Sequence, residues 1–306
     1  MAKKTENKRT SFVPILIILL AIGAVLFLHW HNDRVSWYGE ALTASTVGDE
    51  RLSSHSALMI DLTEDRICYA KNQNERLPIA SLTKIMTALT VIEKCDSLDA
   101  EYTFNGDIIN RMVASHASRA GFEAGETVSV RDLLYGIMLP SGGDAALGAA
   151  EYVAGDEEAF VILMNRRAKQ LGMKNTHFSD VTGLDDTDNY STAADMALLF
   201  AKALENETFF EIVTADRYLT TATEQHKNGI LLESTLNEPM KQYALEGKIL
   251  GGKTGYTTGA GLCLASYAEV EGHRYILVTL GAGDGSKYPS YHFEDAAILY
   301  DEYYIT

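Results

Sequence analysis

The chain has 306 residues, and its 26 lysines and arginines against 42 aspartates and glutamates give it a formal net charge of −16. Binding to nucleic acid or to an anionic membrane surface needs clustered cationic side chains, so this composition argues against both. The hydrophobic share of 46% is ordinary for a globular protein, and a small polar substrate is the better expectation.

The N-terminal segment combines a basic start, residues 1–11, with a stretch over 12–30 that contains no Asp, Glu, Lys or Arg. At about 1.5 Å per residue, a helix over that stretch would be roughly 28 Å long, close to the thickness of a bilayer core. We therefore expect a cytoplasmic tail, one transmembrane anchor and a domain outside the membrane. A cleaved signal peptide is the alternative, although the apolar stretch is long for one.

A polar segment over 31–52 is typical of a linker, and we expect a single domain over 53–306. Two apolar runs around a polar break predict a β-hairpin over 56–72. Apolar residues at helical spacing predict helices over 81–95, 129–139, 144–153, 157–171 and 192–204. A second hairpin around Glu271-Gly272 and a last helix with Phe293 and Tyr300 on one side follow.

Strands at both ends of this domain and helices between them predict an α+β fold. Its antiparallel sheet would be built from the two chain ends, with a helical layer inserted. In such a fold the strand that carries Lys253 and the helix that begins at Ser81 can meet in one cleft.

Metal and disulfide sites have no support in the sequence. The three cysteines, Cys68, Cys95 and Cys263, are too few and too scattered for a disulfide framework and are expected to be small core residues. None of the histidines has the spacing of metal ligands, and we expect a structural role for His177. No metal and no cofactor are therefore expected.

Ser81 and Lys84 are the first candidates for chemistry, because a spacing of three places a hydroxyl and an amine on one helix face. A serine needs a base to act as a nucleophile near neutral pH, and lysine is a base only when it is neutral. Burial and a nearby helix N-terminus both lower the pKa of a lysine. Ser-x-x-Lys is also expected by chance about once in a chain of this length, so the pattern alone decides nothing.

Lys253-Thr254-Gly255 lies in a glycine-rich stretch, where a substrate backbone can approach a strand edge closely. An amine beside a hydroxyl makes a natural receptor for a carboxylate, although an exposed edge strand without function is equally consistent with the pattern. Ser141 lies in a short connection between two predicted helices. Its hydroxyl could pass on a proton there, and a helix-capping turn is the alternative.

In this order the three stretches resemble the motifs of the low-molecular-weight penicillin-binding proteins, the serine D-alanyl-D-alanine carboxypeptidases of peptidase family S11. Ser81-Leu-Thr-Lys84 is similar to the first motif, Ser141-Gly-Gly143 to Ser-x-Asn, and Lys253-Thr-Gly255 to the third. The stretches LLYGIMLPSG, MNRRAKQLGMKNTHF, TGLDD and NYSTAADMA extend the resemblance over residues 56–298.

The resemblance implies a β-lactamase/transpeptidase-like fold and a hydrolase that removes the terminal D-alanine of a peptidoglycan stem peptide, in cell-wall remodelling. Ser81 would form the acyl-enzyme, Lys84 would be the general base, and Ser141 would relay a proton to the leaving amine. β-Lactams would be covalent inhibitors. The enzyme would work outside the bacterial cell membrane.

The same resemblance assigns the substrate contacts. Lys253 and Thr254 would hold the terminal carboxylate, next to Gly255. The backbone N–H groups of Ser81 and Tyr256 would form an oxyanion hole. Because the last predicted helix lies close to the end of the sequence, we expect none of the additional C-terminal β-domain of many relatives.

Two positions depart from the family pattern. Gly143 stands where the family normally has an asparagine, which would hydrogen-bond the lysine and the substrate amide. We therefore expect slower acylation than in a Gly143→Asn variant, since one bond to a charged group contributes roughly 1.5–3 kcal/mol. Asp180-Val181 stands where Asn-Pro is expected, with an effect that the sequence does not predict.

Two alternatives remain open at this stage. A class A β-lactamase shares the serine-lysine logic but needs a glutamate that activates the deacylating water, and no convincing Glu-x-x-x-Asn loop lies between Ser141 and Lys253. A weakly active or non-catalytic peptidoglycan-binding scaffold is the other alternative, motivated by Gly143.

Overall fold

The computed structural model describes residues 36–45, 48–243, 245 and 247–303. The chain divides into two units, Met1–Ser36 and Trp37–Thr306. All helices and strands described below belong to the second unit, except that the first helix begins one residue earlier, at Ser36.

The sheet of the second unit has five antiparallel strands in the order β2-β1-β9-β8-β7. Its strands come from both ends of the unit: β1 (Ser56–Asp61), β2 (Arg66–Lys71), β7 (Lys248–Thr257), β8 (Gly261–Val270) and β9 (His273–Leu280). The N-terminal hairpin joins the C-terminal strands where β1 pairs with β9. This confirms the predicted α+β fold, and it leaves β7 at one edge of the sheet.

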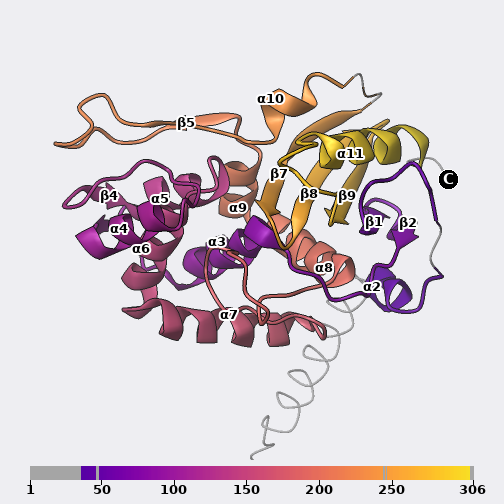
Figure 1. Ribbon diagram of the computed structural model, residues 1–306, viewed down its shortest axis with the longest axis horizontal. Helices are drawn as coiled ribbons and strands as arrows, with labels where there is room; N and C mark the ends of the chain where they lie inside the picture. Colours follow the sequence, from indigo (N-terminus) through magenta and orange to yellow (C-terminus); the bar gives the residue numbers. More distant parts are fainter. Residues whose placement is uncertain (1–35, 46–47, 244, 246, 304–306) are drawn as a thin grey trace, which may run out of the picture. The chain divides into compact units, whose positions relative to one another are not determined.

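Both faces of the sheet are covered, which is why every residue of β1 is buried. Figure 1 shows α11 (Tyr291–Glu302) along one face and α8 (Ala193–Leu204) along the other. Phe293, Leu299 and Tyr300 of α11 pack into a core with alternate residues of β1, β8 and β9. Each such side chain stabilises the fold by about 1.5–3 kcal/mol when fully buried.

The helical layer lies between the two groups of strands in the chain and is built mainly from four helices: α3 (Thr83–Lys94), α5 (Val130–Met138), α6 (Gly143–Ala154) and α7 (Glu157–Leu171). α5 begins with the capping box expected from the sequence, in which Ser129 and Asp132 bond each other's backbone N–H groups. α6 and α7 end at Gly155 and Gly172, both in the left-handed conformation that favours glycine. These helices confirm the predicted helical segments.

Several short elements were not predicted: α2 (Ser36–Ala41), η1 (Ala80–Leu82), β3 (Glu101–Thr103), α4 (Gly106–Ala114), β4 (Thr127–Ser129), α9 (Glu207–Val213), β5 (Arg217–Leu219), β6 (Leu231–Glu233) and α10 (Asn237–Met240). Strands of three residues are too short for an alternating pattern, so only their pairing partners define them. α2 falls within the predicted linker over 31–52, and its Trp37 is fully buried. The predicted domain boundaries stay a prediction.

The structure corrects the localisation expected from the sequence. We predicted one membrane span over 12–30 and a catalytic domain outside the bacterial cell membrane, but none of the helices within the described residues has the length and apolar character to cross a bilayer. The segment 12–30 itself lies outside the described residues. That prediction rested on a basic flank followed by a long apolar stretch, and this local pattern also occurs in segments that do not span a membrane.

Candidate active site

Ser81 and Lys84 meet at the start of the central helix α3. Ser81 lies in the 3-10 turn η1, which runs directly into α3, and Lys84 follows in the first turn of that helix. The Lys84 Nζ lies 3.0 Å from the Ser81 Oγ and 2.6 Å from the carbonyl oxygen of Thr182. The two side chains are therefore in direct hydrogen-bond contact, as the spacing predicts.

The environment of Lys84 favours its neutral form. The side chain is 3% exposed, and burial lowers its pKa from the usual 10.5 to about 8, against the opposing attraction of Asp180 and Asp144. An amine with a pKa close to neutral can take a proton from a neighbouring hydroxyl and give it back. The pair can therefore work as a nucleophile and its base.

The edge strand β7 lies against the Ser81 turn. A Cβ atom at Gly255 would lie 2.9 Å from the Ser81 backbone nitrogen and 3.1 Å from the Ala80 Cβ, so a larger residue does not fit there without a shift. Ala80 itself has a φ of +46°, a left-handed conformation that is strained for a residue other than glycine. The third predicted motif and the first are thus in contact.

Lys253 and Thr254 point to different places. The Lys253 side chain is fully buried, and its Nζ donates to the carbonyl oxygen of Thr254 at 2.7 Å. Burial, together with the nearby charge of Lys84, holds the pKa of Lys253 well below its usual value. The Thr254 hydroxyl instead meets the hydroxyl of Thr235 at 2.6 Å.

Ser141 has two features that are unusual for a surface turn. Its φ of +64° is left-handed, which costs a non-glycine residue on the order of 1–2 kcal/mol. Its side chain is 6% exposed, and its buried Oγ has no hydrogen-bond partner among the described residues. Strain and an unpaired hydroxyl together are typical of functional sites rather than of helix caps.

Two cavities flank Ser81. The first has a volume of about 310 Å³, and its walls include Ser81, Ser141, Thr235, Thr254, Tyr256 and His292. The second, of about 450 Å³, is lined among others by Ser81, Lys84, Ser118, Thr182 and Tyr256. An extended ligand that lies along β7 can therefore fill space on both sides of the Ser81 hydroxyl.

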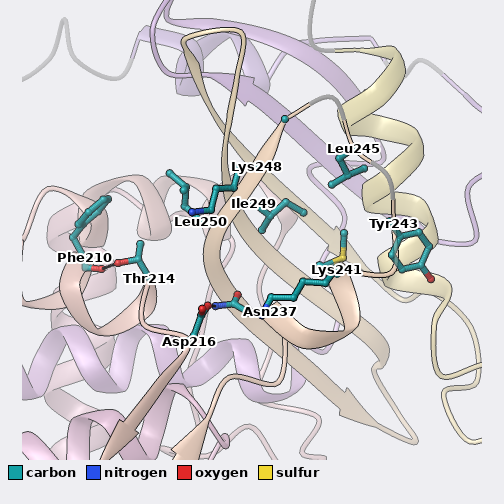
Figure 2. A pocket seen from close by; sticks show the side chains of 12 residues that line it. Phe210, Thr214, Asp216, Asn237, Lys241, Tyr243, Leu245, Lys248, Ile249 and Leu250 are labelled. Carbon is teal, nitrogen blue, oxygen red and sulfur yellow. Dashed lines mark hydrogen bonds between the residues drawn. The ribbon is translucent and has the colours of Figure 1, made fainter.

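A larger cavity of about 580 Å³ lies beside the start of β7 and α10 (Figure 2). Two of its polar side chains have hydrogen-bond partners: the Asn237 amide donates to Asp216 at 2.5 Å, and Lys241 donates to Glu238 at 2.5 Å. The residues that line it include neither a serine nor a cysteine. Its size therefore does not make it the candidate for covalent chemistry.

Gly143 occupies a crowded position at the start of α6. Its backbone nitrogen donates to the Ser118 carbonyl oxygen at 2.7 Å. A Cβ atom there would lie 2.6 Å from the sulfur of Met112, a fully buried residue of α4. Met112 thus fills the space that a side chain at position 143 would need.

Sequence reasoning missed several residues of this site. Thr235 comes from the segment before α10. Thr182 contacts Lys84 through its backbone carbonyl, and because every residue has one, the sequence gives no sign of this contact. Asp180 accepts hydrogen bonds from the backbone nitrogens of Thr182 and Gly183. Its departure from the expected pattern was the one available signal.

The other side chains singled out in the sequence do not line the two cavities beside Ser81. Cys68, Cys95 and Cys263 are all free thiols. The Nδ1 of His177 lies 2.6 Å from the Asp188 carbonyl oxygen, in a loop contact. Among the residues that the structure describes, no three His, Cys, Asp or Glu side chains gather as metal ligands would.

Comparison with known proteins assigns the chain to a family. The sequence model of the D-alanyl-D-alanine carboxypeptidases, peptidase family S11, matches residues 43–284. The chain is 37% identical over 228 residues to the D-alanyl-D-alanine carboxypeptidase DacF of Bacillus subtilis, a match that covers 74% of the chain and 57% of DacF. It is 34% identical over 276 residues to DacD of Escherichia coli, covering 88% of the chain and 67% of DacD.

Solved structures agree with the sequence matches. The Streptomyces K15 DD-transpeptidase superposes with a TM-score of 0.72 at 28% identity, covering 84% of the chain and 97% of that protein. A D-alanyl-D-alanine carboxypeptidase of Mycobacterium tuberculosis gives 0.72 at 25% identity, covering 84% and 93%. The match spans only 57% of the length of DacF. The chain belongs to the D-alanyl-D-alanine carboxypeptidase family of serine peptidases, family S11.

Proposed function

We propose that the protein is a serine DD-carboxypeptidase that removes the terminal D-alanine from a peptidoglycan stem peptide through an acyl-enzyme on Ser81. The observation that carries this proposal is the contact of 3.0 Å between the Ser81 Oγ and the buried amine of Lys84. Family membership supplies the substrate class, because the matched relatives are named D-alanyl-D-alanine carboxypeptidases.

Acylation begins with proton transfer from Ser81 to the neutral amine of Lys84. The Ser81 Oγ attacks the carbonyl carbon of the penultimate D-alanine, and the bond to the terminal D-alanine breaks. The leaving amine takes up a proton, for which the unpaired hydroxyl of Ser141 in the same cavity is the proposed relay. Water then releases the shortened peptide from Ser81.

The substrate contacts follow from the first cavity. Thr254 is the proposed hydroxyl donor to the terminal carboxylate, and the neighbouring hydroxyl of Thr235, 2.6 Å away, is a second proposed donor. Lys253 supports this contact indirectly: its amine donates to the Thr254 carbonyl, and when protonated it adds a positive charge near the carboxylate. The backbone N–H groups of Ser81 and Tyr256 are the proposed oxyanion hole, where each donor contributes about 2.7–4 kcal/mol to the transition state.

Release of D-alanine from a pentapeptide tests the proposal. Wild type should release it, and Ser81→Ala should lower the rate at least about a thousandfold. Ser97→Ala is a matched control, because that exposed serine follows the far end of α3 and should leave the rate unchanged. Equal rates for wild type and Ser81→Ala would refute the assignment.

Incubation with penicillin separates the alternatives by intact mass. A long-lived adduct on Ser81 supports the carboxypeptidase, since the described residues around Ser81 include no glutamate to activate a deacylating water. Rapid multiple turnover of penicillin would favour a β-lactamase. A complete lack of adduct would favour a non-catalytic scaffold.

A further inference from the structure

A tight turn over residues 180–183 lies directly behind the Ser81–Lys84 pair. One carboxylate oxygen of Asp180 accepts hydrogen bonds from the backbone nitrogen of Thr182, from the backbone nitrogen of Gly183 at 2.5 Å and from the Thr182 hydroxyl at 3.0 Å. These three donors tie Thr182 and Gly183 to a single carboxylate oxygen. Asp180 is therefore the residue that organises the turn.

This 180–183 turn contacts both catalytic candidates, Ser81 and Lys84. Its Thr182 carbonyl oxygen accepts from the Lys84 Nζ at 2.6 Å, and its Val181 carbonyl accepts from Thr87, one helical turn later, at 2.8 Å. Gly183 has a φ of +84°, and a Cβ there would lie 1.9 Å from the Ala80 carbonyl oxygen. The turn is thus closely fitted against η1 and α3, so a change in its shape moves the base.

Charged groups from three elements face Lys84. Asp180 comes from the turn, Asp144 from α6, and Lys253 from β7. Asp144 is fully buried, and its carboxylate accepts from four backbone nitrogens of residues 120–122 and 145, which commits it to the packing of that loop. Asp180 is the carboxylate whose bonds all serve the turn that contacts Lys84.

A second carboxylate stands behind Asp180. Glu157 of α7 accepts from the Val181 backbone nitrogen at 3.3 Å and pairs with Arg111 at 2.5 Å. It supports the same turn and carries the same charge, but Arg111 partly neutralises it. It also does not figure among the charges that act on Lys84. Glu157 is therefore a matched comparison for Asp180.

We propose that Asp180 is a positioning residue of the reaction: it holds the Thr182 carbonyl against Lys84, and its negative charge opposes the loss of the Lys84 proton that burial favours. The inference rests on the proposed function, because it assigns to Asp180 control over the base of that reaction. It also gives the departure from Asn-Pro at 180–181 a consequence, since an asparagine could make the same turn without the charge.

The direction of the effect follows from electrostatics. An anion near an ammonium group raises the pKa of that group, so removing the charge of Asp180 lowers the pKa of Lys84 below its value of about 8. The neutral, reactive amine then appears at lower pH. The acid limb of the acylation rate should move in the same direction.

The test compares penicillin acylation rates of three variants over the pH range in which each stays folded. Asp180→Asn keeps an acceptor oxygen for the turn and should shift the acid limb down by about one pH unit, with the plateau rate within about twofold of wild type. Glu157→Gln keeps its own acceptor oxygen and should leave the limb in place. Asp180→Ala removes the acceptor and should lower the plateau about tenfold or more.

The possible outcomes test the electrostatic role and the positioning role of Asp180 separately. An acid limb in Asp180→Asn that coincides with that of wild type overturns the electrostatic role, and an unchanged plateau in Asp180→Ala overturns the positioning role. If Asp180→Ala does not fold, the pH profile of Asp180→Asn still decides. Absence of an adduct in wild type would refute the proposed function instead, which keeps the two failures apart.

Discussion

The site contains two buried lysines whose surroundings differ. Lys84 on α3 and Lys253 on β7 both have a pKa lowered by burial. Lys84 has two carboxylates nearby that oppose this effect, whereas the charge acting on Lys253 is Lys84 itself, which adds to it. The two carboxylates therefore limit how far burial lowers the pKa of Lys84.

The hydrogen bonds divide the two lysines in the same way. The amine of Lys84 donates to a side chain that can react, the Ser81 hydroxyl, while the amine of Lys253 donates to the backbone carbonyl of Thr254 on its own strand. In the proposed mechanism η1 and α3 therefore carry the nucleophile and its base, whereas β7 binds and orients the substrate. The following predictions test this division.

The largest effect is expected from Lys84→Met. Loss of the general base should lower penicillin acylation about a thousandfold. The same change should stabilise the fold below pH 8, because a shift of the pKa from 10.5 to about 8 corresponds to a cost on the order of 3 kcal/mol.

The pH dependence of stability checks the sign of that cost. Between about pH 8 and pH 10.5 the unfolded chain binds a proton at Lys84 that the folded chain does not, so wild type gains stability from this residue as pH rises through that window. Denaturant unfolding of Lys84→Met should lack this gain. A variant less stable than wild type at neutral pH would contradict the prediction.

Gly255→Ala should come next, because it acts on the contact between strand and helix. The added Cβ would lie 2.9 Å from the Ser81 backbone nitrogen, so β7 or η1 must move apart. A misplacement of this kind costs about a hundredfold in rate. Gly39→Ala is the control, since a Cβ at that position would have no atom within 4 Å beyond its chain neighbours and the backbone of its own helix. Full acylation activity in Gly255→Ala would show that the strand does not shape the site.

Lys253→Met should have a smaller effect than Lys84→Met. It removes the bond to the Thr254 carbonyl, and a net hydrogen bond of about 0.5–1.5 kcal/mol corresponds to a loss of up to about tenfold. Acylation rates of the two methionine variants, measured side by side, check the difference. Equal losses in both would break the division between the two lysines.

The sequence predicted the parts of this site that depend on local spacing. Ser81 in η1 and Lys84 in α3 are in contact because three positions separate them, and the long periodic segment at 157–171 coincides with α7. The sheet from both chain ends also followed from the order of strand and helix patterns. These features depend on residues close together in the chain, or on the repeat of a pattern.

The residues that the sequence missed depend on tertiary contacts. Thr235 meets Thr254 across 19 positions, and Asp180 reaches the site only because its turn packs on η1 and α3. Met112 lies on α4, a helix that was not predicted, and approaches Gly143 from another part of the chain. Such pairs leave no periodic signal, so only the folded chain reveals them.

The smallest effect concerns Gly143 and sharpens the expectation drawn from the sequence. In the folded protein a Cβ at position 143 would lie 2.6 Å from the Met112 sulfur, so Gly143→Asn alone must first displace that side chain. We therefore expect the single variant to acylate within about twofold of wild type.

Combined with Met112→Ala, Gly143→Asn should acylate about threefold to tenfold faster than Met112→Ala alone, because the asparagine then has space to hydrogen-bond its neighbours. Penicillin acylation rates of all four proteins form a double-mutant cycle. Additive effects in that cycle would show that Met112 does not control the position, and the glycine would then have to act through the backbone bond to Ser118.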